Sequence, residues 1–188
     1  MRRDGSARQW DRLAIAQPPA IIFWYRQSPR ALIPYNHRFV YETDPPILIS
    51  GMVNIQLDTQ GRLTELVVFP PQIEDPQSRP VEADWEMLFQ EAGLDINKFT
   101  PTDTRWIPAQ HSDIRHAWEG VCPDQPDIAL RVDAASYRGQ PVYFVLRGPW
   151  SKPWRMEEFQ PSLQSRIFLV LIVIVMAVVL VVGLLLVR

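Results

Sequence analysis

The chain has 188 residues, and its 19 basic and 21 acidic side chains give a formal net charge of −2. Two of the basic residues, Arg166 and Arg188, flank an apolar C-terminal run, so the rest of the chain carries 17 basic against 21 acidic residues, a net charge of −4. This slightly acidic balance, with no basic stripe, argues against nucleic acid as a partner, and the single cysteine, Cys122, excludes a disulfide framework within the chain.

Composition and pattern divide the chain into four parts. Residues 1–18 form a polar lead-in, 19–148 a globular domain, 149–166 a juxtamembrane linker and 167–187 a transmembrane helix. Eighteen prolines predict many turns and few long helices. Seven tryptophans indicate a packed core or a contact surface rather than a disordered chain.

The first half of the domain reads as strands. Residues 20–27, "AIIFWYRQ", are β-branched and aromatic and lie between prolines, and residues 37–43 are a further candidate strand. The clearest hairpin covers residues 52–69. Val53, Ile55 and Leu57 alternate there with polar residues, and "DTQG" supplies the turn, with Gly61 suited to a left-handed conformation.

Residues 70–80 are a loop that leads into the best helix of the domain, "DWEMLFQEAGLD" (84–95). Its apolar residues fall at i, i+3, i+4 and i+7, Asp84 is suited to the N-cap, and Gly93 is placed to end the helix; the apolar positions are Trp85, Leu88, Phe89 and Ala92. Residues 112–120, "SDIRHAWEG", repeat this pattern in a shorter form and predict a second short helix.

A second hairpin covers residues 128–148, with Arg138 and Gly139 at the turn. On its return strand Val142, Phe144 and Leu146 share one face. The predicted fold class is therefore α+β: antiparallel β-hairpins with one or two short helices packed on the sheet, followed by one C-terminal transmembrane helix.

The segment 149–166 has the composition of a membrane interface. Aromatic and cationic side chains alternate there, as they do at the level of lipid headgroups, and the candidate interface residues are Trp150, Lys152, Trp154, Arg155 and Arg166. The alternative is an ordinary loop that contains two tryptophans.

The run from Ile167 to Val187 contains 21 apolar residues and no charge. As a helix it is about 31 Å long, which matches a hydrocarbon core of about 30 Å. The run is rich in Val and Ile, but a segment in lipid has to satisfy its own backbone hydrogen bonds, so we expect a helix. A buried core helix is the alternative, and it would rarely be this long or apolar on every face.

Catalytic motifs are scarce. The sequence contains no Gly-rich phosphate loop, no G-K-[ST], no H-E-x-x-H, no C-x-x-C and no G-x-S-x-G. His111, Asp113 and His116 are the nearest approach to a metal site, but the two histidines would point about 140° apart on a helix. Cys122 has no evident base nearby. We predict no catalytic, cofactor or metal residue, and hence no enzyme.

Two further charged groups have ordinary interpretations. The neighbouring Glu157 and Glu158 point in different directions on a helix and make a poor acid–base pair. Arg26, Arg30 and Arg38 lie among aromatic residues and could bind an anion, although covering strand edges is the commoner use.

Several long stretches resemble a region of bacterial membrane-bound serine/threonine protein kinases. They are "PPAIIFWYRQSPRALIP", "DPPILISGMVNIQLDTQGRL", "DWEMLFQEAGLDINKFTPTDTRWIP" and "AWEGVCPDQPDIALRVDAASYRGQPVYFVLRGPW", and the resemblance covers nearly all of residues 9–188. The kinase itself is missing: no Gly-rich loop, V-A-I-K-like lysine, H-R-D or D-F-G occurs, so no catalytic residue can be carried over.

The resemblance implies a fragment or a kinase-less relative of such a receptor, with the domain outside the cytoplasm and the helix in the bacterial cytoplasmic membrane. The flanking charges point the other way. Lys152, Arg155 and Arg166 precede the span and only Arg188 follows it, which would keep the domain of a complete chain in the cytoplasm.

Three functions follow as hypotheses. The first is a single-pass sensor or interaction module in signal transduction, which binds a ligand, a protein partner or a second copy of itself. The second is a tail-anchored cytosolic scaffold. The third, more remote, is a small metal-dependent enzyme at His111, Asp113 and His116.

Overall fold

The computed structural model describes residues 16–73, 79–156 and 163–186. The chain divides into two compact units, residues 1–151 and 152–188. Most of the predicted lead-in, both Glu157 and Glu158, and Val187 lie outside the described residues.

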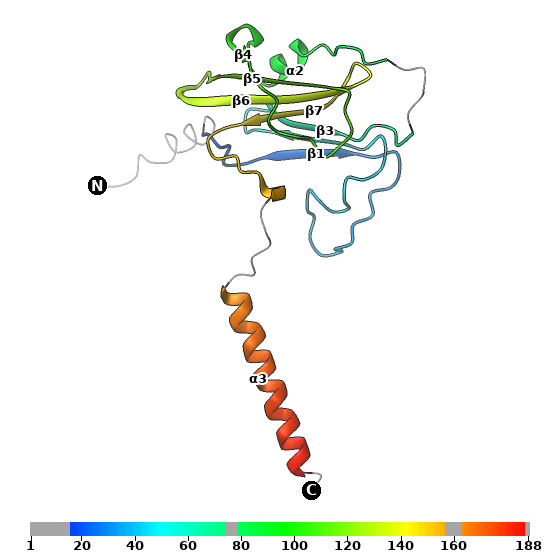
Figure 1. Cartoon of the computed structure of the whole chain (residues 1–188), viewed down its shortest axis with the longest axis vertical. Coiled ribbons are helices and arrows are strands. Elements are labelled where there is room, and N and C mark those ends of the chain that lie inside the picture. The colour runs from blue at the N-terminus through cyan, green and yellow to red at the C-terminus, as the bar shows by residue number, and fades with distance from the viewer. Residues whose placement is uncertain (1–15, 74–78, 157–162, 187–188) are drawn as a thin grey trace, which may run out of the picture. The chain divides into compact units, whose positions relative to one another are not determined.

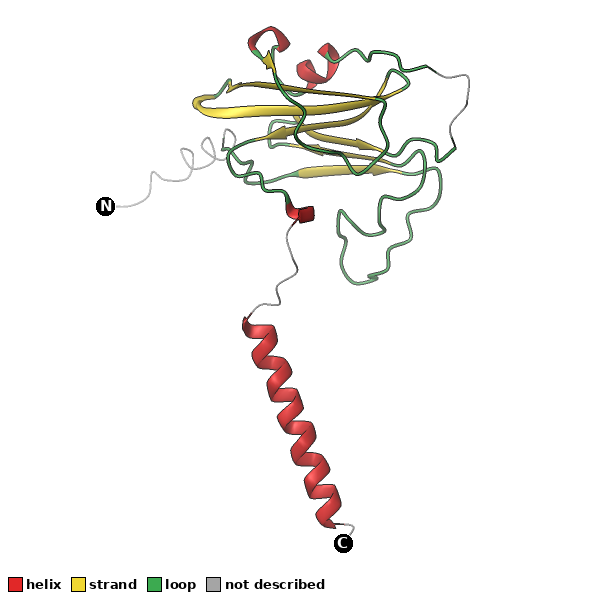
Figure 2. Ribbon diagram, in the orientation of Figure 1, coloured by secondary structure: helices red, strands yellow, loops and turns green. Residues whose placement is uncertain are grey.

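The first unit contains one antiparallel sheet of seven strands. In space they follow the order β1-β2-β3-β7-β6-β5-β4, and all neighbouring pairs are antiparallel (Figure 1). The strands are β1 (Phe23–Gln27), β2 (Val53–Leu57), β3 (Leu63–Val68), β4 (Thr100–Pro101), β5 (Ile114–Cys122), β6 (Gln125–Tyr137) and β7 (Gln140–Arg147). Figure 2 shows how much of the remaining chain in this unit is loop. The predicted antiparallel sheet is confirmed.

Both predicted hairpins are present. The turn between β2 and β3 places Gly61 at φ +78°, and the Asp58 carboxylate accepts backbone hydrogen bonds from Gln60 (2.8 Å) and Arg62 (2.9 Å). The turn between β6 and β7 has only two residues, Arg138 at φ +53° and Gly139 at φ +75°. Two successive left-handed residues match the right-handed twist of the flanking strands.

The helix predicted in residues 84–95 is α2 (Glu86–Glu91), and its apolar face is the predicted one. The Asp84 carboxylate accepts a hydrogen bond from the Glu86 backbone N–H (3.0 Å). Gly93, at φ +69°, ends the helix: its N–H donates to Gln90 O (2.9 Å), and the N–H of Leu94 donates to Phe89 O (2.8 Å). This pair of bonds is a Schellman motif.

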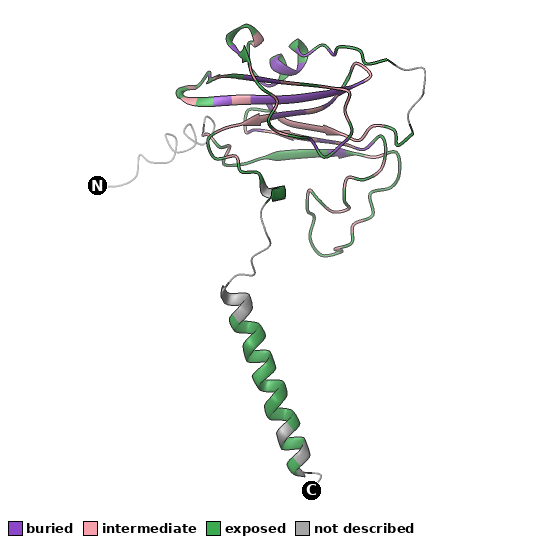
Figure 3. Cartoon of the chain, viewed as in Figure 1, coloured by how far each residue is buried: buried purple, intermediate pink, exposed green. Residues whose placement is uncertain are grey.

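Phe89 of α2 is the centre of the core. It is fully buried, and its ring contacts Phe99, Trp118 and Phe144 edge to face, with centroids 5.4, 5.3 and 5.6 Å away. These partners come from β5, β7 and the segment before β4, so one side chain connects α2 to the middle of the sheet. Figure 3 shows that burial is concentrated under α2 and along β6.

The second short helix predicted at residues 112–120 is wrong. This segment is β5, which pairs with β6 from Ile114 to Cys122. Both faces of β5 are covered, so Ala117 and Trp118 are buried side by side and the alternation typical of a strand is lost. The spacing of Ile114, Ala117 and Trp118 then imitates a helix, and long-range pairing decides the outcome.

The strand predicted at residues 20–27 is confirmed as β1, whereas the candidate strand at 37–43 is wrong. Residues 28–52 form an irregular connection between β1 and β2, which projects from the sheet in Figure 1. Four prolines and the polar turns that they favour account for the lack of regular structure.

The second unit contains a short 3-10 helix, η2 (Trp154–Met156), and the helix α3 (Leu163–Leu186). The predicted C-terminal helix is thus present over 24 residues. In the part of the chain that the structure describes, no helix meets the joint requirement of length and hydropathy for crossing a membrane. The transmembrane assignment therefore stays a prediction.

Replacing Phe89 by alanine tests the aromatic core. We expect Phe89→Ala to lower the free energy of unfolding by about 3–5 kcal/mol, because it leaves a cavity that three rings cannot fill. Met87→Ala, at an exposed position of the same helix, should change it by less than about 0.5 kcal/mol. Urea unfolding of the full chain in detergent measures both, and similar effects of the two variants would contradict this role of Phe89.

Candidate functional site

The sheet face opposite α2 is unusually polar. The register aligns Gln56 of β2 with Glu65 of β3, Glu65 with Val145 of β7, and Val145 with Asp133 of β6. Side chains in such a row point to the same face of the sheet. We call this surface the polar face, and its members are Asn54, Gln56, Glu65, Arg131, Asp133, Tyr143 and Arg147.

Asp133 is at the centre of the polar face, and its side chain is only 3% exposed. Arg131 Nε lies 3.0 Å from Asp133 Oδ1, and Arg147 Nε lies 3.0 Å from Oδ2. Burial raises the pKa of this carboxyl, although the two guanidinium groups act in the opposite direction. One buried carboxylate therefore holds two cations on adjacent strands.

Each arginine has further partners. Arg131 Nη1 is 2.8 Å from the exposed Glu119 carboxylate, and Arg131 Nη2 donates to the carbonyl of Asp103. Arg147 Nη2 donates to Tyr143 Oη (2.5 Å). Its guanidinium also lies 3.7 Å from the centroid of the Trp106 ring, a cation–π contact. The segment between β4 and β5 is thereby fastened over the polar face.

Two carboxyl groups meet at the β2–β3 end of the polar face. Glu42 Oε1, from the connection between β1 and β2, accepts hydrogen bonds from Asn54 Nδ2 (2.7 Å) and Gln56 Nε2 (2.6 Å). Glu65 lies near Glu42. Burial and the negative charge of Glu42 raise the pKa of Glu65, while Arg147 lowers it. A carboxyl with a raised pKa is a common feature of catalytic acids, and structural networks produce the same shift.

The geometry of the polar face is that of a brace. Its two arginines bind Asp133 and hold the segment between β4 and β5 on the sheet. Separately, Asn54 and Gln56 hold the β1–β2 connection through Glu42. Sequence reasoning missed this network. The signal was present in Arg131 and Asp133, which are two positions apart and therefore on one face of a strand, but only the register reveals Arg147 and Glu65 as their neighbours.

The residues of the remote metal-site hypothesis have separate partners. His111 Nε2 is 3.8 Å from Asp113 Oδ1, and His116 Nε2 is 2.8 Å from Glu82 Oε1 instead. Asp113 Oδ2 accepts a hydrogen bond from the Arg138 backbone (2.7 Å) and so supports the β6–β7 turn. Within residues 16–73, 79–156 and 163–186, no three His, Cys, Asp or Glu side chains are placed to hold a metal ion.

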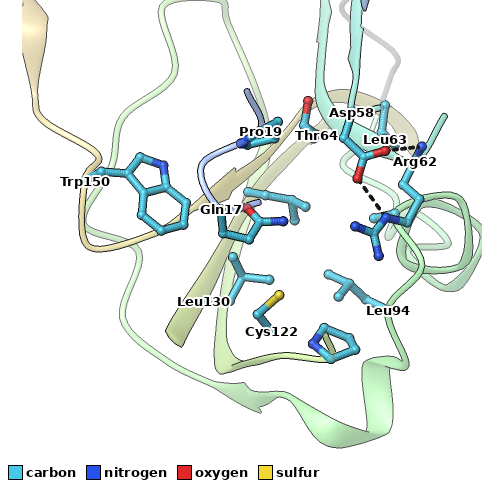
Figure 4. Close-up of a pocket in the computed structure, with 13 residues that line it drawn as sticks. Gln17, Pro19, Asp58, Arg62, Leu63, Thr64, Leu94, Cys122, Leu130 and Trp150 are labelled. Atoms are coloured by element: carbon cyan, nitrogen blue, oxygen red, sulfur yellow. Dashed lines mark hydrogen bonds and ion pairs between the residues drawn. The ribbon is translucent and has the colours of Figure 1, made fainter. Parts of the chain in front are cut away.

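A small cavity lies between the β2–β3 turn and the end of β5 (Figure 4). It has a volume of about 60 Å³. Its walls are mostly apolar and include Leu94, Leu130 and the ring of Trp150, while Arg62 pairs with Asp58 at 2.8 Å on one side. Ligand sites are usually about 300–1,000 Å³, so the space suits a few water molecules rather than a substrate.

Cys122 lines this cavity with a buried, unpaired thiol. An activated cysteine requires a cationic or basic group beside its sulfur. Among the described residues, no nitrogen forms an ion pair or hydrogen bond with the Cys122 thiol. The thiol acts here as a small apolar group.

The five predicted membrane-interface residues are divided between the two units, and their role at a membrane stays a prediction. Trp150 belongs to the first unit, where it is 37% exposed and lines the cavity. Lys152 and Arg155 are exposed residues of the second unit, which also contains Trp154 and Arg166. The side chains of Trp154 and Arg166 are not among those described.

The three arginines among the aromatics also differ. Arg26 is 8% exposed, and its guanidinium donates to the carbonyl of Pro45. Arg30 and Arg38 are exposed. Arg26 therefore fastens the β1–β2 connection to the sheet, whereas the other two face solvent.

Removing the central carboxylate tests the brace. We expect Asp133→Asn to lower the free energy of unfolding by about 3–5 kcal/mol, because two largely buried guanidinium groups lose their counter-charge. Glu119→Gln removes a largely exposed partner of the same Arg131 and should cost less than about 1 kcal/mol. Chemical unfolding at neutral pH compares them, and an Asp133→Asn loss no larger than the control would count against the brace.

The raised pKa of Glu65 predicts a pH dependence of stability. The folded protein binds its proton more tightly than the unfolded chain, so ionisation of Glu65 lowers stability as pH rises from about 4.5, the ordinary value, through the folded pKa. Glu65→Gln removes this loss. We therefore expect the variant's stability relative to wild type to increase with pH over this window and then level off.

Unfolding curves between pH 4 and pH 8 measure this difference. Glu91→Gln, at an exposed position of α2, is the control and should show no comparable trend. A relative stability of Glu65→Gln that is flat or falls with pH would show that the buried carboxyl is not destabilised by its charge.

Comparison with known proteins adds no relative: no family model matches the chain, and neither a curated protein nor a solved structure is significantly similar to it. The resemblance to membrane-bound serine/threonine kinases thus stays an expectation from the sequence.

Proposed function

We propose that this chain is a membrane-anchored interaction module without catalytic activity of its own. In this proposal α3 is the anchor, and the sheet unit contacts a ligand, a protein partner or a second copy. In line with the kinase resemblance, the module couples binding to the kinase of a bacterial signalling receptor, with the sheet unit outside the cytoplasm.

The apolar surface of α3 is the observation that carries the proposal. No charged residue occurs from Ile167 to Leu186, and the ten consecutive side chains of residues 167–176 are 45–66% exposed. Ten residues at 100° intervals cover all sides of a helix, so no polar side is left for water. A helix of this kind is stable in a bilayer or inside a large core. Its 24 residues span about 36 Å, enough for a hydrocarbon core.

The sheet unit supports a binding role rather than catalysis. Arg131, Asp133 and Arg147 of its polar face bind one another, and its cavity near Cys122 is too small for most substrates. Its exposed apolar residues are instead concentrated on β1 and the connection after it. An exposed apolar surface of this kind is typical of a contact with another molecule.

A tail-anchored scaffold facing the cytoplasm is the second candidate. Lys152, Arg155 and Arg166 precede α3, and basic residues favour the cytoplasmic side of a span. Protease treatment of sealed, right-side-out vesicles separates the two: digestion of the sheet unit indicates the extracytoplasmic orientation, and protection indicates the cytoplasmic one.

Two arginines in the middle of α3 test the anchor. Each Arg at the centre of a span costs about 2.5–3.5 kcal/mol, so Ile172→Arg/Val179→Arg should move much of the chain out of the membrane fraction after alkaline extraction. The matched control is Ile167→Arg/Leu185→Arg. It adds the same charge near the ends of the helix, where arginine reaches the headgroups, and should stay with the membrane. Wild-type chain in the aqueous supernatant would refute the proposal.

A further inference from the structure

The connection between β1 and β2 contains a group of exposed apolar side chains that the fold does not use. We call residues 30–48 the aromatic loop. Its most exposed apolar members are Ile33 (69%), Tyr35 (81%), Phe39 (61%), Val40 (83%) and Leu48 (71%). Figure 3 shows this loop as largely exposed, in contrast to the buried β6. Isolated exposed residues are normal, but several in one short segment mark a contact surface.

The loop has internal supports of its own. Asp44 accepts hydrogen bonds from the backbone N–H of Tyr35 (Oδ1, 2.8 Å) and of Asn36 (Oδ2, 2.8 Å), and these bonds lower its pKa. Asn36 Oδ1 in turn accepts from the backbone of Arg38 (2.9 Å) and Phe39 (3.2 Å). Glu42 and the Pro45 carbonyl bind the polar face and Arg26. These hydrogen bonds thus hold the loop in a conformation in which its apolar side chains are exposed.

The acidic and basic side chains of the loop differ in their surroundings. Both of its carboxylates accept hydrogen bonds within the fold: Glu42 binds Asn54 and Gln56, and Asp44 binds the loop backbone. Its two arginines, Arg30 and Arg38, are exposed among the apolar residues. The outer surface therefore combines aromatic, aliphatic and cationic groups, which is the chemistry of a segment that enters the headgroup region of an anionic bilayer.

We propose that the aromatic loop docks the sheet unit onto the surface of an anionic lipid bilayer. The inference rests on the proposed anchor, because α3 would keep the unit near the membrane: the 11 residues between Ser151 and Leu163 span at most about 40 Å. Such a tether raises the effective concentration of a weak surface contact. Ile21 and Ile22, which precede β1, and Phe23 at its start are exposed as well.

A bilayer fits this surface better than a second copy does. The residues of the loop have no regular strand or helix that could pair with its own copy. Like charges would also meet in a symmetric contact, since Arg30 and Arg38 are exposed, whereas Glu42 is held by Asn54 and Gln56. Anionic lipid supplies both the missing negative charge and the apolar surroundings.

The test places an environment-sensitive fluorophore on the loop of the full chain. Val40→Cys and, as control, Met87→Cys are each combined with Cys122→Ser and labelled with a nitrobenzoxadiazole dye; Met87 is 58% exposed on α2. Both proteins are reconstituted in phosphatidylcholine vesicles with or without phosphatidylserine. Near-ultraviolet circular dichroism against wild type confirms that each variant is folded.

We expect the Val40 label, and not the Met87 label, to shift to the blue and to lose emission when doxyl-labelled lipid is present. Both effects should be larger with phosphatidylserine, and Arg30→Glu/Arg38→Glu should remove that increase. Equal, unquenched emission from the two labels in vesicles that retain the chain would refute docking while leaving the anchor intact. A Val40 shift without doxyl quenching that disappears on dilution with lipid would show a contact between copies and also refute it. Chain that does not float with the vesicles would refute both proposals.

Discussion

A sheet of seven strands has two faces that must be covered, and the first unit has little helix with which to do so. The helix α2, six residues long, packs on one face through Leu88 and Phe89, and the ring of Phe89 makes the central contacts. The opposite face is covered by irregular segments, which cannot bury their polar backbone cheaply. They are fastened instead by ion pairs and hydrogen bonds around Asp133 and Glu42. Neither α2 nor the irregular segments cover β1, so most of its side chains are exposed.

The parts of the fold that depend on neighbouring residues could be predicted from the sequence. Both hairpins, the apolar face of α2 and the end of the helix at Gly93 follow from spacing and turn chemistry, and the structure confirms them. What depends on distant partners could not be predicted. The spacing of Ala117 and Trp118 is typical of a helix, and only pairing with β4 and β6 makes this segment a strand. Asp133 contacts its second arginine, Arg147, only through the β6–β7 register. The conformation of the aromatic loop likewise depends on Glu42, which binds β2, and on Asp44, which binds the loop backbone.

These features favour recognition by surface rather than by a deep site. The central charges of the polar face are chemically quiet, since Arg131, Asp133 and Arg147 already bind one another or their neighbours. A rigid sheet with a supported loop at its edge presents a preformed contact, which limits the entropy lost on association. Such a unit is suited to binding another molecule through its surface.

The strand order also dictates how the domain is put together. The β2–β3 and β6–β7 hairpins each form between sequence neighbours, but the two halves join only where β3 meets β7, more than 70 residues later in the chain. During synthesis the outer side of β3 stays open until β7 has been made, and the apolar stretch that becomes α3 follows close behind. Closure of the sheet and synthesis of the apolar helix α3 are therefore neighbouring events for the nascent chain.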